Sequence, residues 1–355
     1  MQRRSSVLVT GGAGFIGSHL CDRLLRDGWR VTAVDDLSQG RPSNLVDAVR
    51  GGEFDFIATD VRSVAHLRAA FSNARPDVVM HLADAPGVRT SVEDPAHDAA
   101  VNIIGLIRVL EASTEFGVRR VVVAGSAGTI YGNLRQLPAA EGRRRASLPL
   151  SPHGISKKTA EDYLRFFRAA RGLGFTMLAI GNAYGPRQDP YGDSGVVAIF
   201  ARSMLARQPP TIYGDGLQTR DFVYVDDVVE AFCRAAAVPE AEGRVVNIGT
   251  GVETSVVHVC TLLQELTGFA AAPYRRPPPK GEVRRIALDP SGARALLGWI
   301  PATPLPEGLR RVVQHLRSTE PAGPGVQADV DLTLEEERPV RPVPNGPSGG
   351  PSRRI

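Results

Sequence analysis

Residues 10–17 read Thr10-Gly11-Gly12-Ala13-Gly14-Phe15-Ile16-Gly17 and stand between an apolar run, Val7–Val9, and an amphipathic stretch, Phe15–Leu25. This order predicts a strand, a glycine turn and a helix, which is the context that a dinucleotide-binding motif requires. In such a motif the first glycine permits a tight turn, the second lets the backbone approach a pyrophosphate, and the third lets the helix pack closely. Gly11, Gly14 and Gly17 hold these places, with Phe15 and Ile16 in the first helical turn. We therefore expect the helix N-terminus to face the phosphates of a dinucleotide.

An acidic pair follows the next apolar run. Residues 31–34 form that run and Asp35-Asp36 ends it. An acidic residue about 20 residues beyond the glycines hydrogen-bonds a ribose hydroxyl and repels a 2′-phosphate. The sequence therefore predicts an NAD site rather than an NADP site, with Asp35, Asp36 and Ser38 near the ribose.

Apolar runs alternate with helical patterns over the first 180 residues. The runs are Val7–Thr10, Val31–Asp35, Phe54–Ala58, Val78–Ala83, Val121–Gly125 and Thr176–Gly181, with Val245–Ile248 as a late candidate for the same sheet. Continuous Val/Ile/Leu runs separated by helices are typical of a parallel sheet covered on both faces. We predict an α/β fold with a Rossmann-type doubly wound sheet, whose ligands collect at the carboxyl ends of the strands.

The pattern changes near residue 181, where Gly, Pro and Tyr become frequent. We predict a Rossmann domain over 1–180 with a returning segment near 220–250, and a smaller α/β substrate-binding lobe over 181–317. Residues 318–355 are rich in Pro, Gly, Glu and Arg and contain few large apolar side chains. Such a composition predicts a disordered tail.

Charge and cysteine usage narrow the class of protein. The net charge of +4 is small for 355 residues and the arginines are spread along the chain, so we expect no nucleic-acid partner. The chain has no apolar run of about 18 residues and no leader pattern, which predicts a cytoplasmic protein without a membrane partner. Cys21, Cys233 and Cys260 lie far apart in apolar helical patterns, a spacing that suits core thiols and neither a metal site nor a disulfide.

Further motifs accompany the glycine loop in a fixed order: Asp35-Asp36-Leu37-Ser38, His81-Leu82-Ala83, Ser91-Val92-Glu93-Asp94-Pro95, Val101-Asn102-Ile103, Tyr131-Gly132, Asn182-Ala183-Tyr184-Gly185-Pro186-Arg187-Gln188, Thr219-Arg220-Asp221-Phe222-Val223-Tyr224-Val225-Asp226-Asp227 and Leu297-Gly298-Trp299. From about Val7 to Val313 the chain resembles the nucleotide-sugar epimerases of the extended short-chain dehydrogenase/reductase family. It looks like the bacterial proteins similar to UDP-glucose 4-epimerase, including those acting on UDP-glucuronate. The resemblance implies an NAD-dependent 4-epimerase acting on a UDP-hexose or UDP-uronate.

The resemblance also implies roles for single residues. Around the cofactor it places Asp60 and Val61 beside the adenine, Leu82 and Ala83 along the cleft, and Asn102 as a further contact. For the substrate it implies that Asn182 touches the sugar diphosphate, that Ile212 and Tyr213 bracket the base, and that Arg220 neutralises a phosphate. Read without the resemblance, Asn182 could be a turn former and Arg220 could pair with Asp221 at the surface.

The chain departs from the family at the catalytic motif. The family has Tyr-x-x-x-Lys at a helix start and a Ser or Thr four residues before the Tyr-Gly pair. Here His153 stands at the tyrosine's place, Lys157 is present, and Ala127 stands at the place of the hydroxyl. Ser126 and Thr129 are nearby hydroxyls. If the strand continues through them, Thr129 points to the same side as Ala127 and is the better substitute.

A histidine can serve the chemistry that a 4-epimerase needs. The base must accept a proton from the 4-hydroxyl and later return it. A tyrosine, with an ordinary pKa near 10, needs a neighbouring cation to ionise, whereas a neutral imidazole accepts a proton at about pH 7. Residues 153 and 157 lie on one face of a helix, so His153 and Lys157 can act together.

Alternatives remain at this stage. His153 could instead be a solvent-facing loop residue in a family member that binds NAD and a nucleotide sugar without efficient turnover, or the chain could be another NAD-dependent sugar-nucleotide oxidoreductase. Dehydratase and decarboxylase chemistry is disfavoured because Ala127, Gly128 and Thr129 provide no acid before Tyr131. The family finally implies a homodimer through the helical stretches Ala99–Phe116 and Ser156–Arg171.

Overall fold

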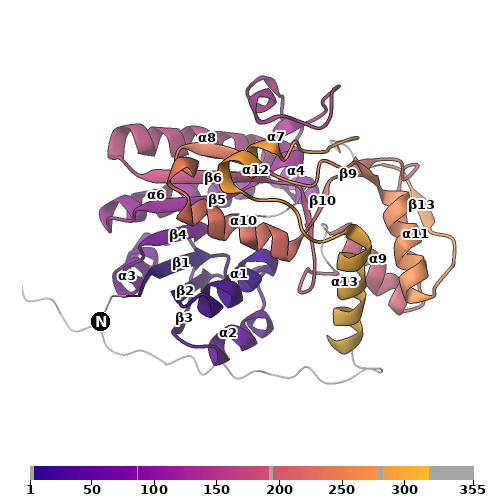
Figure 1. Ribbon diagram of the computed structural model, residues 1–355, viewed down its shortest axis with the longest axis horizontal. Helices are drawn as coiled ribbons and strands as arrows, with labels where there is room; N and C mark the ends of the chain where they lie inside the picture. Colours follow the sequence, from indigo (N-terminus) through magenta and orange to yellow (C-terminus); the bar gives the residue numbers. More distant parts are fainter. Residues whose placement is uncertain (1–3, 86, 192–194, 279–282, 320–355) are drawn as a thin grey trace, which may run out of the picture. The chain divides into compact units, whose positions relative to one another are not determined.

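The computed structural model describes residues 4–85, 87–191, 195–278 and 283–319. Its centre is a parallel sheet of seven strands in the order β11-β6-β5-β4-β1-β2-β3 (Figure 1). The strands are β1 (Ser6–Thr10), β2 (Arg30–Asp35), β3 (Phe54–Ala58), β4 (Val78–His81), β5 (Arg120–Ser126), β6 (Gly174–Ile180) and β11 (Arg244–Ile248). Each corresponds to one of the predicted apolar runs, and the predicted Rossmann-type α/β fold is confirmed.

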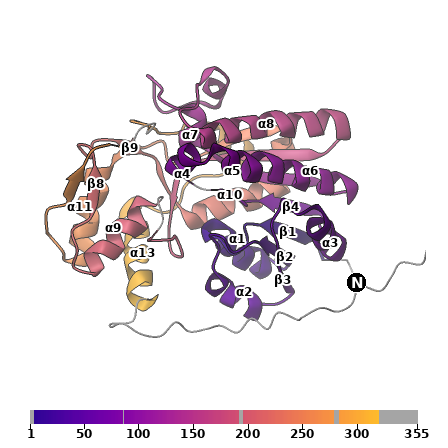
Figure 2. The same ribbon diagram turned by 180° about the vertical axis from the view of Figure 1, so that it is seen from behind.

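Two layers of helices cover the sheet (Figure 1 and Figure 2). One face packs against α1 (Phe15–Arg26) and α10 (Val225–Ala237), and the other against α3 (Val64–Ala74), α6 (Leu106–Glu115) and α8 (Pro152–Arg171). Because strand side chains alternate, Val7 and Val9 join the first core while Leu8 joins the second. This explains why the strands are apolar at consecutive positions.

Short helical segments connect these layers. They are η1 (Pro42–Leu45), α2 (Val46–Arg50), α4 (Val88–Glu93), α5 (Pro95–Ala99), the π-helix η2 (Ala100–Gly105), α7 (Ala127–Tyr131), η3 (Glu141–Ala146), η4 (Pro239–Ala241) and α12 (Ser291–Leu297). The stretch predicted as one helix over 99–116 is therefore divided into η2 and α6. Such π-helical turns occur frequently at functional sites.

A smaller lobe lies beside the sheet. Its helices α9 (Val196–Leu205), α11 (Val256–Thr267) and α13 (Leu305–Thr319) pack against one another (Figure 2). Its strands form three short pairs: β7 (Asn182–Tyr184) with β10 (Phe222–Tyr224), β9 (Thr219–Arg220) with β12 (Thr254–Ser255), and β8 (Thr211–Tyr213) with β13 (Tyr274–Arg276).

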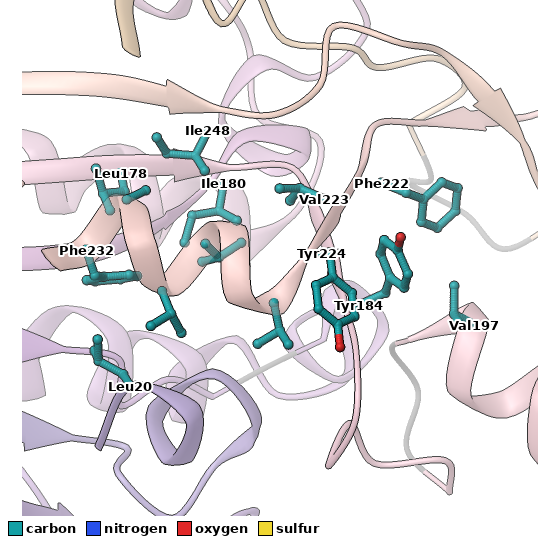
Figure 3. Packing of buried hydrophobic residues seen from close by; sticks show 14 of the residues in the cluster. Leu20, Leu178, Ile180, Tyr184, Val197, Phe222, Val223, Tyr224, Phe232 and Ile248 are labelled. Carbon is teal, nitrogen blue, oxygen red and sulfur yellow. The ribbon is translucent and has the colours of Figure 1, made fainter. Parts of the chain in front are cut away.

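An aromatic cluster joins the lobe to the sheet. The ring of Tyr184 meets those of Phe222 and Tyr224 edge-on, with centroids 6.2 and 5.6 Å apart. Figure 3 shows these rings between Ile180 of the sheet and Val197 of α9. One apolar core therefore runs from the sheet into the lobe.

Strand β11 is formed by chain that has already passed through the lobe. It pairs with β6 from Arg244 opposite Thr176 to Ile248 opposite Ile180. Its Asn247 accepts a hydrogen bond of 2.8 Å from the hydroxyl of Tyr131. The last strand of the sheet is thus tied to α7, beside the site described below.

The C-terminal part of the lobe is held by Trp299 of the Leu297-Gly298-Trp299 motif. The indole N–H of Trp299 donates to the carbonyl of Asp227 at 2.8 Å, and the Asp227 carboxylate accepts from the amides of Ala302 and Thr303. The motif is therefore structural. None of the described helices combines the length and apolar composition needed to cross a bilayer. The predicted disordered tail begins too early, because Ser318 and Thr319 form the end of α13, and residues 320–355 lie outside the described residues.

Candidate active site

The glycine loop lies where the strand order reverses. The chain adds β2 and β3 on one side of β1 and places β4 on the other, and a crevice at such a reversal is where ligands bind in doubly wound sheets. Gly11 has a φ of +70°, and a Cβ there would lie 2.7 Å from the nitrogen of Ala83. A Cβ at Gly17 would lie 2.0 Å from the carbonyl oxygen of Gly11. Both glycines are required for this close packing.

The N-terminus of α1 fits an anionic ligand. Gly14 is the N-cap, no side chain caps the helix, and its first turn contains no acidic residue. Phe15 and Ile16, which open the helix, are partly buried against the core. The uncapped N–H groups and the positive end of the helix dipole suit the pyrophosphate of a dinucleotide.

Asp35 supports the loop from the end of β2. Its carboxylate accepts hydrogen bonds of 2.9 Å from the backbone N–H groups of Ala13 and Leu37. Burial raises the pKa of Asp35, and these backbone donors oppose that shift. The residue predicted to contact a ribose therefore also fixes the shape of the glycine loop.

The other predicted cofactor residues surround the same edge. Asp36 accepts from the N–H and hydroxyl of Ser38 at 3.0 and 2.6 Å. The guanidinium of Arg62 holds the pKa of Asp60 below its usual range, and Val61 is buried against Gly105 of η2.

Residues 81–84 connect the glycine loop to a second cluster. His81, at the end of β4, lies 2.7 Å from the hydroxyl of Thr10 through its Nδ1. Burial, and then the charge of Lys157, lower the pKa of His81 to about 3, so its imidazole is neutral. Leu82 and Ala83 follow, with the backbone of Ala83 against Gly11. The next side chain, Asp84, makes an ion pair with Lys157.

His153 and Lys157 lie on the first turns of α8. This helix begins at Pro152, earlier than predicted, because Ser151 caps it by accepting from the N–H of Gly154 and because proline suits the first helical position. The side chain of His153 is 6% exposed and that of Lys157 is 9% exposed. The interpretation of His153 as a solvent-facing loop residue is therefore wrong.

Two carboxylates face His153. Its Nδ1 lies 3.4 Å from Oδ1 of Asp98 and 3.8 Å from Oδ1 of Asp84. The other oxygen of Asp84 lies 3.1 Å from Nζ of Lys157, which also donates to the carbonyl of Ala124 at 3.4 Å. We call these four residues, His153, Lys157, Asp84 and Asp98, the α8 cluster.

Asn102 and Ser156 hold Asp98 in place. The amide nitrogen of Asn102 donates to Oδ1 of Asp98 at 2.9 Å, and the hydroxyl of Ser156 donates to Oδ2 at 2.5 Å. Burial favours a raised pKa at Asp98, but the hydrogen bonds from His153 and Ser156 bring it below its usual value. At Asp84 burial is likewise outweighed, here chiefly by the charge of Lys157, and the pKa is lowered. Both carboxyl groups are therefore ionised at neutral pH.

The predicted direction of Thr129 is wrong. Strand β5 ends at Ser126, and Ala127–Tyr131 form the helical turn α7, so the alternation of a strand does not apply. The hydroxyl of Thr129 donates to the carbonyl of Ser126 at 3.0 Å. The turn forms because Tyr131 is anchored to Asn247 and Ser147 bonds to the carbonyl of Ile130.

The predicted substrate residues lie in the lobe. Asn182 opens β7 and is half-buried, with its backbone N–H bonded to the carbonyl of Asp221. Ile212 is buried in the core while Tyr213 is 40% exposed, because successive strand residues point to opposite faces. A base bracketed by both side chains does not fit this arrangement.

Asp221 is buried and serves the backbone rather than the surface. Its carboxylate accepts from the backbone N–H groups of Thr250, Gly251 and Leu288. Arg220, its neighbour on β9, is half-buried and donates to the carbonyl of Thr219 at 2.9 Å. The alternative that Arg220 pairs with Asp221 at the surface is therefore wrong, because the Asp221 carboxylate is buried.

Sequence reasoning missed Asp84 and Asp98. The spacing from Asp98 to Asn102 is one helical turn, which would have placed both side chains on one face. Asp84 directly follows Leu82 and Ala83, the residues expected along the cleft. These two signals were available, but only the packing of α5 and η2 on α8 identifies His153 as their shared neighbour. Among the described residues, no group of His, Cys, Asp and Glu is arranged to hold a metal.

Comparison with known proteins identifies the family of the chain. The model of the NAD dependent epimerase/dehydratase family matches residues 7–249. The chain is 44% identical over 311 residues to the UDP-glucose 4-epimerase of Mycolicibacterium smegmatis, covering 88% of this chain and 98% of that protein.

Two solved structures show the same similarity. The UDP-glucose 4-epimerase of Thermotoga maritima with UDP-glucose has a TM-score of 0.84 and 44% identity, over 88% of this chain and 99% of that one. The UDP-glucuronic acid 4-epimerase of Bacillus cereus, in complex with UDP-glucuronic acid and NAD, has a TM-score of 0.80 and 30% identity over the same shares. With the glycine loop, the seven-stranded sheet and these matches taken together, the chain belongs to the NAD-dependent epimerase/dehydratase family.

Proposed function

We propose that this protein is an NAD-dependent nucleotide-sugar 4-epimerase that acts on a UDP-hexose or UDP-uronate through a transient 4-keto sugar. The observation that carries the proposal is the junction of two parts of the site. The backbone of Ala83 touches the glycine loop, and the next residue, Asp84, binds Lys157 of the α8 cluster. A buried imidazole and ammonium thus lie next to a dinucleotide cradle, as a reaction that moves a proton and a hydride together requires.

The cofactor in this proposal is NAD. The uncapped start of α1 would hold its pyrophosphate, and Asp35 and Asp36 at the end of β2 would face the adenine ribose, where a 2′-phosphate would be repelled. Asp60, Val61, Leu82, Ala83 and Asn102 would line the rest of the cleft. When bound, the nicotinamide supplies an acceptor for the hydride of C4.

His153 acts as the general base in this proposal, at the place where the family has tyrosine. It takes the proton of the sugar's 4-hydroxyl as the hydride leaves C4. After the keto sugar turns over, the hydride returns to the opposite face of C4 and the imidazolium returns its proton to the oxygen. Lys157 keeps positive charge beside the reacting oxygen and holds the nicotinamide ribose. Ser126 and Thr129 lie in the neighbouring turn as candidate hydroxyl contacts.

The relatives named above support a UDP-sugar as substrate. Arg220 would neutralise a phosphate, Asn182 would contact the diphosphate, and Tyr213 would cover the base with its exposed ring. Because Ile212 is buried, we assign it to the support of β8.

The test is a turnover assay with four substrates. UDP-glucose, UDP-glucuronate and their N-acetyl relatives are each incubated with the protein and NAD, and the products are read by proton NMR. We expect inversion at C4 of at least one sugar with the protein at catalytic concentration. If no sugar is inverted although a UDP-sugar raises the melting temperature, the protein is a binder without turnover and the proposed activity is refuted.

We also propose a homodimer formed through η2, α6 and α8. Ile104 and Phe166 are large apolar side chains on this surface and are 45% and 57% exposed. The variant Phe166→Glu should give a monomer by light scattering after gel filtration. The matched control is Val49→Glu on α2, where a comparably exposed apolar side chain lies outside the proposed interface. A wild-type monomer would refute the interface.

We further propose that the protein acts in the cytoplasm without nucleic-acid or membrane partners.

A further inference from the structure

The contacts of His153 are concentrated on one ring nitrogen. Oxygens of Asp98 and Asp84 and the amide nitrogen of Asn102 all lie within 3.8 Å of Nδ1. Within the described part of the chain, Nε2 makes no hydrogen bond. The imidazole therefore has one side turned to carboxylates and one nitrogen left for another partner.

The orientation of Asn102 decides which groups can donate. Its Oδ1 accepts from the N–H of Ala85 at 3.1 Å, so its nitrogen points to Asp98. An ionised carboxylate cannot donate, so Asp98 accepts from Asn102 and Ser156 and is an acceptor for a proton on Nδ1 of His153. The amide nitrogen of Asn102 lies 3.4 Å from Nδ1 but 2.9 Å from Asp98, so the carboxylate is its closer acceptor. A lone pair on Nδ1 would instead face the negative oxygens of both Asp98 and Asp84.

Asp84 adds a second negative charge on the same side. Its Oδ1 is buried and makes no hydrogen bond to any residue that the structure describes. It lies 3.8 Å from Nδ1 of His153. A buried acceptor without a donor is costly, and a proton on the facing Nδ1 reduces that cost.

The charges of the α8 cluster are unbalanced before the reaction and balanced once the imidazole has taken the substrate's proton. With a neutral imidazole, two carboxylates and one ammonium leave one net negative charge. A proton arriving at Nε2 makes the cluster neutral. In a dry site such balancing is worth more than in water.

We propose that Asp98 is a positioning residue for His153: it holds a proton on Nδ1, supported by the negative charge of Asp84, so that Nε2 presents its lone pair to the substrate's 4-hydroxyl. This inference rests on the proposed function, in which His153 is the base, and adds the two residues that select its tautomer. The base thus works as a carboxylate–imidazole pair, in which Asp98 itself touches neither sugar nor cofactor. The proton passes from the 4-hydroxyl to Nε2, while the proton on Nδ1 stays in place.

The first test reads the tautomer directly. Nitrogen-15 NMR of the free protein, recorded along a pH titration, should show the neutral form of His153 with a proton on Nδ1 and none on Nε2. The signals are assigned by their loss in His153→Gln. Asp98→Asn, which has nearly the same shape, should allow the other tautomer, because its amide can donate to Nδ1.

The second test separates positioning from binding. Asp98→Asn should lower kcat about a hundredfold or more with little change in KM, since general-base catalysis is worth about 10²–10⁴-fold. Ser156→Ala removes one hydrogen bond to Asp98 but keeps its charge, and should cost less than Asp98→Asn. The matched control is Asp162→Asn, an exposed carboxylate on α8 that should change neither tautomer nor kcat.

The outcomes distinguish this inference from the proposed function. A wild-type His153 protonated on Nε2 overturns it, and so does an Asp98→Asn protein that is folded yet keeps both the tautomer and kcat. If no sugar is inverted but the tautomer is on Nδ1 and changes in Asp98→Asn, the epimerase proposal fails and the positioning role stands.

Discussion

The glycine loop and the α8 cluster meet at residues 83–84, but they are built in different ways. The loop is made of backbone: a few consecutive residues, the packing of Gly11 against Gly17, and one supporting carboxylate, Asp35. The α8 cluster is made of side chains that come from α5, from α8 and from the segment after β4. The first can be recognised in a single stretch of sequence, whereas the second exists only once distant segments pack. We infer that the loop tolerates little change of shape and that the cluster tolerates little change of chemistry.

Removing the imidazole should give the largest effect. His153→Gln keeps a hydrogen-bonding side chain but cannot take up a proton, and kcat should fall about 10²–10⁴-fold with cofactor affinity preserved. The measurement is steady-state turnover beside calorimetric binding of NAD. A His153→Gln protein that turns over at the wild-type rate would show that the cluster is not the catalytic part of the site. A second variant, His153→Tyr, restores the family's tyrosine. If His153→Tyr is faster than wild type and His153→Gln is no slower, the histidine is not the base.

A change of shape in the loop should affect binding first. In Gly17→Ala the new Cβ would lie 2.0 Å from the carbonyl oxygen of Gly11, so helix and loop must move apart. Overpacking of this kind costs about 1–3 kcal/mol of stability, and we expect NAD affinity to fall at least about tenfold (1.4 kcal/mol). Gly142→Ala is the control, because nothing lies near its Cβ position. Equal NAD affinity in Gly17→Ala and wild type would contradict the close-packed loop.

His81, which lies between the glycine loop and the α8 cluster, should make the free energy of unfolding depend on pH. The unfolded chain binds a proton at His81 below about pH 6.5, whereas the folded protein, with a pKa of about 3, does not. Protons therefore favour the unfolded state between these values, and stability falls as pH falls. Lowering the pH from about 7 to 5 should cost about 2 kcal/mol through this residue.

Urea titrations at the two pH values measure this contribution. His81→Gln should remove it while leaving an amide to pair with the hydroxyl of Thr10. His66→Gln changes an exposed histidine and should leave the pH dependence as it is. A His81→Gln protein with the same loss of stability on acidification would show that His81 is not the group responsible.

The surface ion pair of Arg62 with Asp60, at the edge of the predicted cofactor site, should give the smallest effect. The guanidinium of Arg62 binds the carboxylate of Asp60 at 2.5 Å, but the two side chains are 37% and 31% exposed. Exposed pairs are typically worth less than about 1 kcal/mol, so Arg62→Ala should change the free energy of unfolding by less than that. A larger loss of unfolding free energy in urea denaturation would mean that the surroundings of the glycine loop also depend on side-chain charges.

Most of the fold could be predicted from the sequence because its strands and the glycine loop are local patterns. Every predicted strand range of the sheet corresponds to a strand, and α1 begins at Phe15 as expected. The bounds of Rossmann domain and lobe remain predictions. The failures have local physical causes. The turn α7 forms because Tyr131 bonds to Asn247, a contact across 116 residues that no window of sequence contains.

The site was predicted in part for the same reason. His153 and Lys157 are four residues apart on one helix, so their proximity follows from helical spacing alone. Their carboxylate partners come from other segments, and the sequence spacing from Asp84 to His153 does not predict a contact. The burial of His153 likewise depends on the packing of α5 and η2 over α8. Chemistry assembled across segments has to be observed in three dimensions.

The return of the chain to the sheet has a consequence for how the protein is made. Strand β6 ends at Ile180 and its partner β11 ends at Ile248, so the edge of β6 stays open while the intervening chain is synthesised. At roughly 5–20 residues per second, that interval lasts roughly 3–14 s. An apolar strand with an unpaired edge is a template for pairing with other chains. During this interval a second nascent chain can pair with β6 in the place of β11. Slower translation of the lobe lengthens the interval.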